Sequence, residues 1–183
     1  MTITAVDTGF VVFTDLVGFT QLTSERGDEF ALSLLERQDQ IVRSALTDGA
    51  RVVKELGDGL LLWFPEGTAP LDVCLALQQS FCDASTDDAP MWVRMGMHWG
   101  RPRRRGDDLI GHDVNLAARI VDVAGPGEVL VSEPALARLG LAGIGAAPEP
   151  TRGSRGYVFE ELGPVFVKGI ADPVRLFRAV PDC

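Results

Sequence analysis

The sequence predicts an α+β fold with a ferredoxin-like core, in which helices cover one face of an antiparallel sheet. Apolar, β-branched runs alternate along the chain with segments whose apolar residues recur at helical spacing. Over residues 9–99 their order is strand, helix, strand, strand, helix, strand. The chain has 183 residues and is 46% apolar, which is enough for one well-buried core and too little to favour two domains. We therefore expect residues 1–183 to form a single domain.

The first strand and the first helix are predicted within residues 9–49. Residues 9–16 form an apolar, β-branched run that is typical of a buried strand. Asp28 can cap a helix that ends at Asp48-Gly49. The apolar residues at helical spacing between these limits are Phe30, Leu34, Ile41 and Ala45.

A hairpin, a second helix and a fourth strand follow. Residues 50–56 and 60–64 flank Gly57-Asp58-Gly59, and a glycine-rich tight connection between apolar runs predicts a β-hairpin. Thr68 can cap the second helix, and a strand is expected around 91–99. The inward-facing positions of that helix are Leu71, Cys74, Leu75, Gln78, Phe81 and Cys82.

Beyond the core the sequence predicts an additional helix and further strands. Gly125-Pro126 stops the helix, and the Gly- and Pro-rich composition of residues 140–156 favours an exposed loop. The expected order is a basic loop at 101–107, a helix at 112–124, a strand near 128–132 and strands around 157–168 and 174–180.

The charge of the chain limits its partners. A net charge of −9 argues against general binding of nucleic acid, which relies on Lys and Arg neutralising phosphates. No apolar stretch approaches the roughly 20 residues that a membrane span needs, and no cationic region precedes the first apolar run. We therefore expect a soluble, cytoplasmic protein with no nucleic-acid or membrane partner.

Cysteine and histidine spacing indicates no metal site of the zinc type. Cys74, Cys82 and Cys183 show no CxxC spacing, and we expect buried, reduced thiols at the first two. His98 and His112 lack the spacing of zinc ligands.

Two aspartates each adjoin an apolar run. Asp15 follows Val-Val-Phe-Thr, and Asp58 lies between the two strands of the predicted hairpin. Alone, Asp58 would be an ordinary turn residue. A carboxylate such as Asp15 is costly if buried and unpaired, so a cation or hydrogen-bond donors should lie beside it. If the strands are neighbours, both carboxylates meet at one sheet edge and can hold a divalent cation for phosphoryl transfer.

Three segments carry a family resemblance. They are Phe13-Thr14-Asp15-Leu16-Val17-Gly18-Phe19-Thr20, Lys54-x-x-Gly57-Asp58-Gly59 and Asp108-Leu109-Ile110-Gly111-x-x-Val114-Asn115-x-Ala117-Ala118-Arg119. Together they resemble the catalytic domain of class III nucleotidyl cyclases, from about residue 9 to 135, with a weaker match at Val167-Lys168-Gly169. That family has a ferredoxin-like core with extra elements, in agreement with the order above.

The resemblance implies a metal and phosphate site. Asp15 and Asp58 would jointly bind two divalent ions, Mg²⁺ or Mn²⁺. Backbone N–H groups around Gly18, Phe19 and Thr20 would approach the nucleotide phosphates, as in a nest.

The resemblance also implies a base-reading pair, Lys54 and Asp108. Alone, Lys54 would be a solvated lysine, and strand alternation places it on the side opposite Val53 and Glu55. In adenylate-specific members the lysine at this position contacts adenine, and its partner aspartate lies seven residues before the motif asparagine, which gives Asp108. The adjacent Asp107 leaves that register open. A carboxylate accepts from the exocyclic amine of adenine, which favours ATP over GTP.

The last candidate residues lie on the predicted third helix and near the C-terminus. Asn115 and Arg119 share a helix face, although an ion pair between Arg119 and Asp122 is equally well spaced. By resemblance, Asn115 orients the ribose and Arg119 stabilises charge on the α-phosphate. Lys168 would bind the β- and γ-phosphates or be an ordinary strand-end charge.

The resemblance implies an adenylate cyclase that converts ATP to 3′,5′-cyclic AMP and pyrophosphate in a homodimer with shared active sites. The alternatives are a guanylate cyclase and a catalytically weak nucleotide-binding or interaction domain. A P-loop enzyme is excluded because G-x-x-x-x-G-K-[ST] is absent. The basic cluster is either solvated or placed at the dimer contact or the mouth of the site; it consists of Arg101, Arg103, Arg104 and Arg105.

Overall fold

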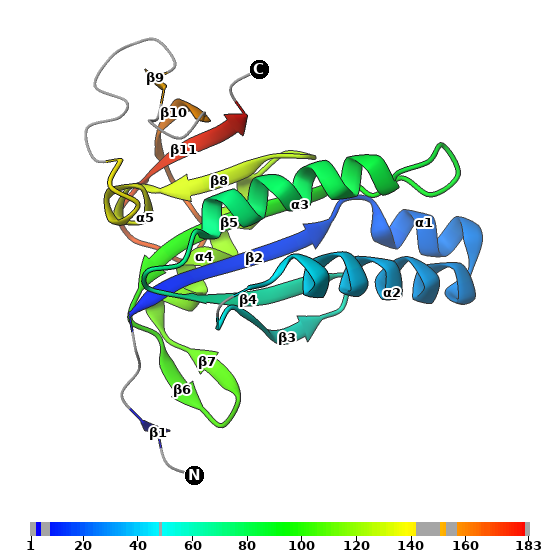
Figure 1. The fold of residues 1–183 in the computed structure, drawn as a ribbon, viewed down its shortest axis with the longest axis horizontal. Coiled ribbons are helices and arrows are strands. Elements are labelled where there is room, and N and C mark those ends of the chain that lie inside the picture. Colours follow the sequence, from blue (N-terminus) through cyan, green and yellow to red (C-terminus); the bar gives the residue numbers. More distant parts are fainter. Residues whose placement is uncertain (1–2, 5–7, 48, 142–150, 153–156, 182–183) are drawn as a thin grey trace.

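A computed structural model of the chain describes residues 3–4, 8–47, 49–141, 151–152 and 157–181. Its main feature is an eight-stranded sheet (Figure 1). In spatial order the strands are β3 (Arg51–Leu56), β4 (Gly59–Pro65), β2 (Gly9–Leu16), β5 (Val93–Gly100), β8 (Val129–Ser132), β11 (Val174–Pro181), β10 (Tyr157–Val165) and β9 (Thr151–Arg152). A small second sheet contains β1 (Ile3–Thr4), β6 (Arg103–Arg105) and β7 (Asp108–Ile110).

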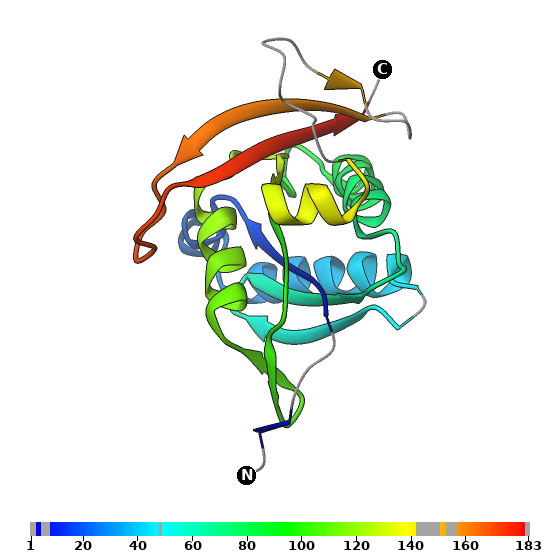
Figure 2. The same cartoon turned by 90° about the vertical axis from the view of Figure 1, so that its left-hand side faces the viewer.

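The described helices pack on both faces of the large sheet. They are α1 (Phe19–Arg26), α2 (Asp28–Ala45), α3 (Pro70–Ala84), α4 (His112–Val123) and α5 (Glu133–Arg138). Figures 1 and 2 show α2 and α3 on one face of the sheet and α4 on the other. The predicted core is confirmed, since β2, α2, β3, β4, α3 and β5 follow in that order and β3-β4-β2-β5 pair antiparallel.

The central strand β2 is apolar from Gly9 to Phe13 because helices cover both of its sides there. Phe10 and Val12 belong to the cluster under α2 and α3, whereas Val11 and Phe13 pack with α4. Successive side chains of a strand point to opposite faces, so a doubly covered strand has no polar face. The close approach of α4 depends on Gly96 in β5, where a Cβ would lie 2.4 Å from the backbone nitrogen of Val121.

Several predicted details are wrong at helix ends. Asp28 is the first residue of α2 rather than its cap, which is Gly27, and there its charge favours the helix dipole. Thr68 does not cap α3, because Ala69 holds that place and the Thr68 hydroxyl donates to the carbonyl of Pro65 at 2.6 Å.

Two short helices were not predicted. Helix α1 has no buried residue, so its sequence carries no apolar periodicity. Helix α5 is only six residues long, and Ser132 caps it by accepting from the backbone N–H of Ala135.

The predicted basic loop at 101–107 is in part a strand. Arg103–Arg105 form β6, which pairs antiparallel with β7. The arginines of β6 are exposed, so the strand has no apolar pattern by which to recognise it. Of the predicted loop at 140–156, residues 142–150 and 153–156 lie outside the described residues, and Thr151–Arg152 pair with β10 as β9.

The cysteine prediction holds at one position and fails at another. Cys74 is buried, and burial raises the pKa of its thiol to about 12. Cys82 is exposed, because it lies one residue beyond the buried stripe of α3 that ends at Phe81. Cys183 lies outside the described residues. Within the described part of the chain, no helix combines the length and apolar character required to cross a bilayer.

Candidate active site

The two predicted metal ligands lie at one edge of the sheet. Asp15 is next to the last residue of β2 and pairs with Gly59, the first residue of β4. Asp58 occupies the turn immediately before Gly59, so the strand pairing brings its carboxylate toward Asp15. A Cβ at residue 59 would lie 2.8 Å from the Thr14 carbonyl oxygen, which explains why glycine is needed beside Asp58.

Arg94 is a charged neighbour of Asp15 that sequence reasoning missed. It lies directly opposite Asp15 on β5. Its Nη2 and Nε atoms lie 2.6 and 2.7 Å from Oδ2 of Asp15, and its Nη1 donates to the carbonyl of Asp122 in α4 at 3.3 Å. The signal in the sequence was an arginine within the otherwise buried strand β5, where an unpaired charge is costly.

The electrostatics of Asp58 reflect two carboxylates held close together. Burial, followed by the nearby charge of Asp15, raises the pKa of Asp58. A backbone hydrogen bond and the Arg94 guanidinium oppose that rise. Asp15 therefore disfavours the charged form of Asp58, whereas Arg94 favours it.

The donor set fits a hard divalent cation that is shared with a phosphate ligand. Among the described residues, no group of three or more His, Cys, Asp or Glu side chains is placed to hold a metal. Asp15 and Asp58 would supply carboxylate oxygens, and the other ligands would be oxygens of water, of substrate phosphates or of the backbone. Mg²⁺ is commonly held in this way, by one or two carboxylates together with substrate phosphates.

The raised pKa of Asp58 leads to a stability prediction. In the fold Asp58 binds its proton more tightly than in the unfolded chain, so rising pH through that window favours unfolding. We expect Asp58→Asn to raise the melting temperature of the metal-free protein at neutral pH by about 1–3 °C, after allowance for solvent screening. Thermal melts with EDTA at pH 4 and pH 7.5 test this, because the gain should be smaller at pH 4. A lower melting temperature for Asp58→Asn at pH 7.5 would contradict it.

The predicted base-reading residues contact each other. Lys54 Nζ lies 2.8 Å from Oδ2 of Asp108, and this hydrogen bond lowers the pKa of the Asp108 carboxyl. No described contact joins Lys54 to the Asp107 side chain, and the backbone carbonyl of Asp107 accepts from Arg51 at 3.3 Å. The geometry thus selects Asp108 over Asp107 as the partner of Lys54.

A β-bulge in β3 determines which way Lys54 faces. Val52 pairs with Leu62, Lys54 pairs with Leu61, and Val53 is the extra residue between them. Val53 packs in the cluster with α4, and Lys54 faces that same side to reach Asp108. The prediction that Lys54 lies opposite Val53 is therefore wrong, because simple alternation ends at the bulge. Lys54 does lie opposite Glu55, which contacts Arg43 of α2.

Helix α4 presents Asn115 and Arg119 on its exposed side and buries its apolar stripe. Nη1 of Arg119 lies 3.0 Å from Oδ2 of Asp122, so the ion pair considered from the sequence is present. The described contacts join neither Asn115 nor Arg119 to Asp15 or Asp58 of the same chain.

The remaining candidates lie in two connections. Gly18 precedes α1, so Phe19 and Thr20 form its first turn directly beyond Asp15. Lys168 is exposed in the turn between β10 and β11, after Val167, which packs in the cluster with α4. The structure therefore places Gly18–Thr20 directly after the predicted metal ligand Asp15, and it places Lys168 in a separate connection.

Comparison with known proteins identifies the class. Residues 1–178 match the family described as Adenylate and Guanylate cyclase catalytic domain. A pH-sensitive adenylate cyclase of Mycobacterium tuberculosis is 34% identical over 92% of this chain, which spans 39% of that relative's length. The chain therefore belongs to the adenylate and guanylate cyclase catalytic domain family.

Solved structures support the fold. The catalytic core of a rhodopsin-guanylyl cyclase with converted specificity, in complex with ATPαS, has a TM-score of 0.76 at 18% identity, with 99% of both chains covered. The adenylyl cyclase CyaB from P. aeruginosa has a TM-score of 0.69 at 21% identity and covers 98% of this chain and 96% of its own. The expected α+β cyclase fold is thereby confirmed.

Proposed function

We propose that this chain is an adenylate cyclase catalytic domain that converts ATP to 3′,5′-cyclic AMP and pyrophosphate. The observation that carries the proposal is the pairing of Lys54 with Asp108 on the same chain that brings Asp15 and Asp58 to one sheet edge. Relatives named adenylate cyclase in two Streptomyces species support it. The family match over residues 1–178 supports treating residues 1–183 as one catalytic domain.

Base selection follows from the chemistry of the pair. Lys54 and Asp108 contact each other, and both side chains are partly exposed to solvent. With adenine bound, Asp108 accepts from the exocyclic amine and Lys54 donates to the ring. Guanine carries a carbonyl where adenine carries that amine, so the Asp108 carboxylate would face a second acceptor and reject the base.

Phosphoryl transfer takes place at the aspartates. Asp15 and Asp58 would hold two divalent ions, which activate the ribose 3′-hydroxyl and neutralise charge on the triphosphate when bound. Backbone N–H groups at Gly18–Thr20 orient the phosphates. Arg94 adds positive charge at the same edge. Most of the rate enhancement then comes from alignment and from charge placed where negative charge develops.

The active site is shared between two copies of the chain. Asn115 and Arg119 point to solvent and make no described contact with the aspartates of their own chain. In a two-fold dimer each site takes Asp15 and Asp58 from one copy. The other copy supplies Asn115, Arg119 and the two residues that read the nucleotide base, Lys54 and Asp108. Asn115 then orients the ribose, Arg119 stabilises the α-phosphate, and Lys168 contacts the outer phosphates.

Product analysis tests the proposed function. Purified protein is incubated with ATP or GTP and with Mg²⁺ or Mn²⁺, and the products are separated by chromatography. We expect cyclic AMP and pyrophosphate in equal amounts and far less cyclic GMP. A preference for GTP would identify a guanylate cyclase, and the absence of any cyclic product with either metal would indicate a nucleotide-binding or interaction domain.

Base selection gives a second prediction. Lys54→Glu combined with Asp108→Cys removes or inverts the groups that face the base, so the ratio of kcat/KM for ATP over GTP should fall about 10-fold or more. Initial rates with both nucleotides measure that ratio. Arg51→Gln, which alters the neighbouring contact to Asp107, is the matched control and should leave the ratio unchanged. An unaltered ratio in an active double variant would show that these residues do not read the base.

A further inference from the structure

The buried side of α2 contains one polar residue among apolar neighbours. Ala31, Leu34 and Val42 form an apolar stripe, and Gln38 lies within it with only 1% of its surface exposed. A buried amide without partners costs free energy, so a glutamine at this position needs a specific contact to offset that cost.

That contact is with the turn that carries Asp58. Nε2 of Gln38 donates to the backbone carbonyl of Asp58 at 3.1 Å. The bond runs from the middle of α2 to the tip of the β3–β4 hairpin and fixes the backbone from which the Asp58 carboxylate projects. An apolar residue of equal size would fill the space but leave this carbonyl without its donor.

The turn needs such a tether for two reasons. The Asp58 and Asp15 carboxylates repel each other when no cation is present, which pushes the turn away from β2. On the side of α2 the turn also borders an open pocket of about 290 Å³, which is lined in part by Leu35, Gln38 and Gly57.

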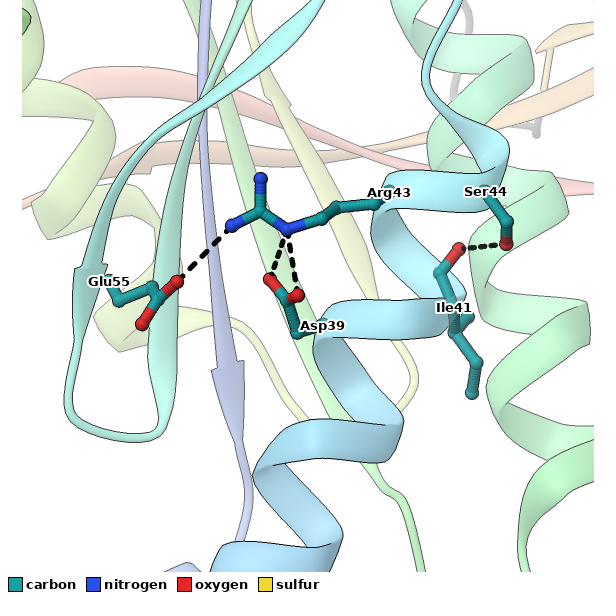
Figure 3. A network of polar contacts seen from close by, with 5 residues as sticks. All are labelled: Asp39, Ile41, Arg43, Ser44 and Glu55. Atoms are coloured by element: carbon teal, nitrogen blue, oxygen red, sulfur yellow. Dashed lines mark hydrogen bonds and ion pairs between the residues drawn. The ribbon is translucent and has the colours of Figure 1, made fainter.

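A second contact links α2 to the hairpin farther from its tip. Arg43 donates through Nε to both carboxylate oxygens of Asp39 at 2.7 Å and through Nη2 to Glu55 of β3 at 3.2 Å (Figure 3). These side chains are largely exposed, so their ion pairs contribute little to stability. They join α2 to Glu55, near the end of β3, whereas Gln38 alone among the described side chains donates to Asp58 itself.

We propose that Gln38 is a positioning residue that holds the Asp58 turn so that Asp15 and Asp58 bind the divalent ions together. This inference rests on the proposed function for the catalytic role of the bound ions. What it predicts, however, is metal binding, which is measured separately from activity. Contacts of this kind, one shell beyond the ligands, commonly change metal affinity by 10–100-fold.

The test compares three variants. Gln38→Met keeps the length of the side chain and removes its donor. Gln38→Asn keeps the amide, but its side chain is too short to reach the Asp58 carbonyl. It is smaller than glutamine and therefore fits the same space, so it replaces Gln38→Met if that variant fails to fold. Gln40→Met makes the same exchange at an exposed position of the same helix and is the control. Circular dichroism checks the fold of each variant.

Two measurements are made with Mn²⁺ as the probe. Binding to the nucleotide-free protein is followed by loss of the EPR signal of free Mn²⁺, and the Mn²⁺ dependence of cyclic AMP formation is measured at saturating ATP. We expect both Gln38 variants to bind Mn²⁺ about tenfold more weakly and to need about tenfold more of it for half-maximal activity. The KM for ATP at saturating Mn²⁺ should stay within twofold, as should every value for Gln40→Met.

The outcomes separate this inference from the proposed function. If a folded Gln38 variant binds Mn²⁺ as Gln40→Met does, the positioning role is wrong even when cyclic AMP is made. If Mn²⁺ binding depends on Gln38 but no cyclic nucleotide forms, the positioning role stands and the proposed function fails. An effect of Gln38→Met that persists in an Asp58→Asn background would also overturn the inference, because Gln38 would then act elsewhere.

Discussion

Asp58→Ala is expected to reduce cyclic AMP formation by about 10³-fold or more while the protein keeps its fold. The carboxylate makes no contribution to the apolar core, and it stands in a turn at the sheet edge beside Asp15. Its removal takes away one of the two proposed carboxylate ligands for the cations, which would supply several kcal/mol of transition-state stabilisation. Asp15→Ala should lose as much activity.

The two variants should differ in stability. Asp15→Ala leaves the guanidinium of Arg94 without its carboxylate partner in a half-buried place, so this variant should melt at a lower temperature than the wild type. Asp58→Ala relieves the repulsion between the two carboxylates and should not lower the melting temperature. Cyclase assays together with circular dichroism and thermal melts measure both effects. Asp87→Ala, at an exposed loop position, is the control. Activity within a few-fold of wild type in either active-site variant would remove the metal assignment.

Much of the core could be predicted because its patterns are local. A strand is predicted by the apolar run of β2, a helix by the periodicity of α2 and a hairpin by Gly57-Asp58-Gly59. Each pattern is contained in a short stretch of sequence. Helix α1 and strand β6 escaped prediction because tertiary contacts, rather than buried apolar stripes, keep them in place.

The candidate site shows the same limit. Asp15 and Asp58 could be paired from the sequence, since the apolar strands that lead to them predict a common edge. The partners that hold them, Arg94 and Gln38, come from elements distant in the sequence and are recognisable only once the fold is known. The orientation of Lys54 depends on a bulge at Val53, and no residue type marks that position in advance.

Two inactive variants should restore each other's activity when mixed. Asp58→Ala chains lack a metal ligand but keep Asn115 and Arg119, and Arg119→Ala chains have the opposite defect. In a mixed dimer with shared sites, one site carries both lesions and the other carries neither. With random mixing at equal amounts, about half of the dimers are mixed and each has one intact site of two, so activity should recover to about a quarter of wild type.

This recovery is the most direct test of an ATP cyclase with its active site shared between two copies of the chain. The two variants are co-expressed with different tags and purified through both, and mass spectrometry confirms that mixed dimers form. Each variant alone provides the baseline for cyclic AMP formation from ATP. Doubly purified mixed dimers should have about half of wild-type activity, because each contains one intact site of two. Activity no higher than either baseline in confirmed mixed dimers would mean that each site is built within one chain, and the shared-site account would be wrong.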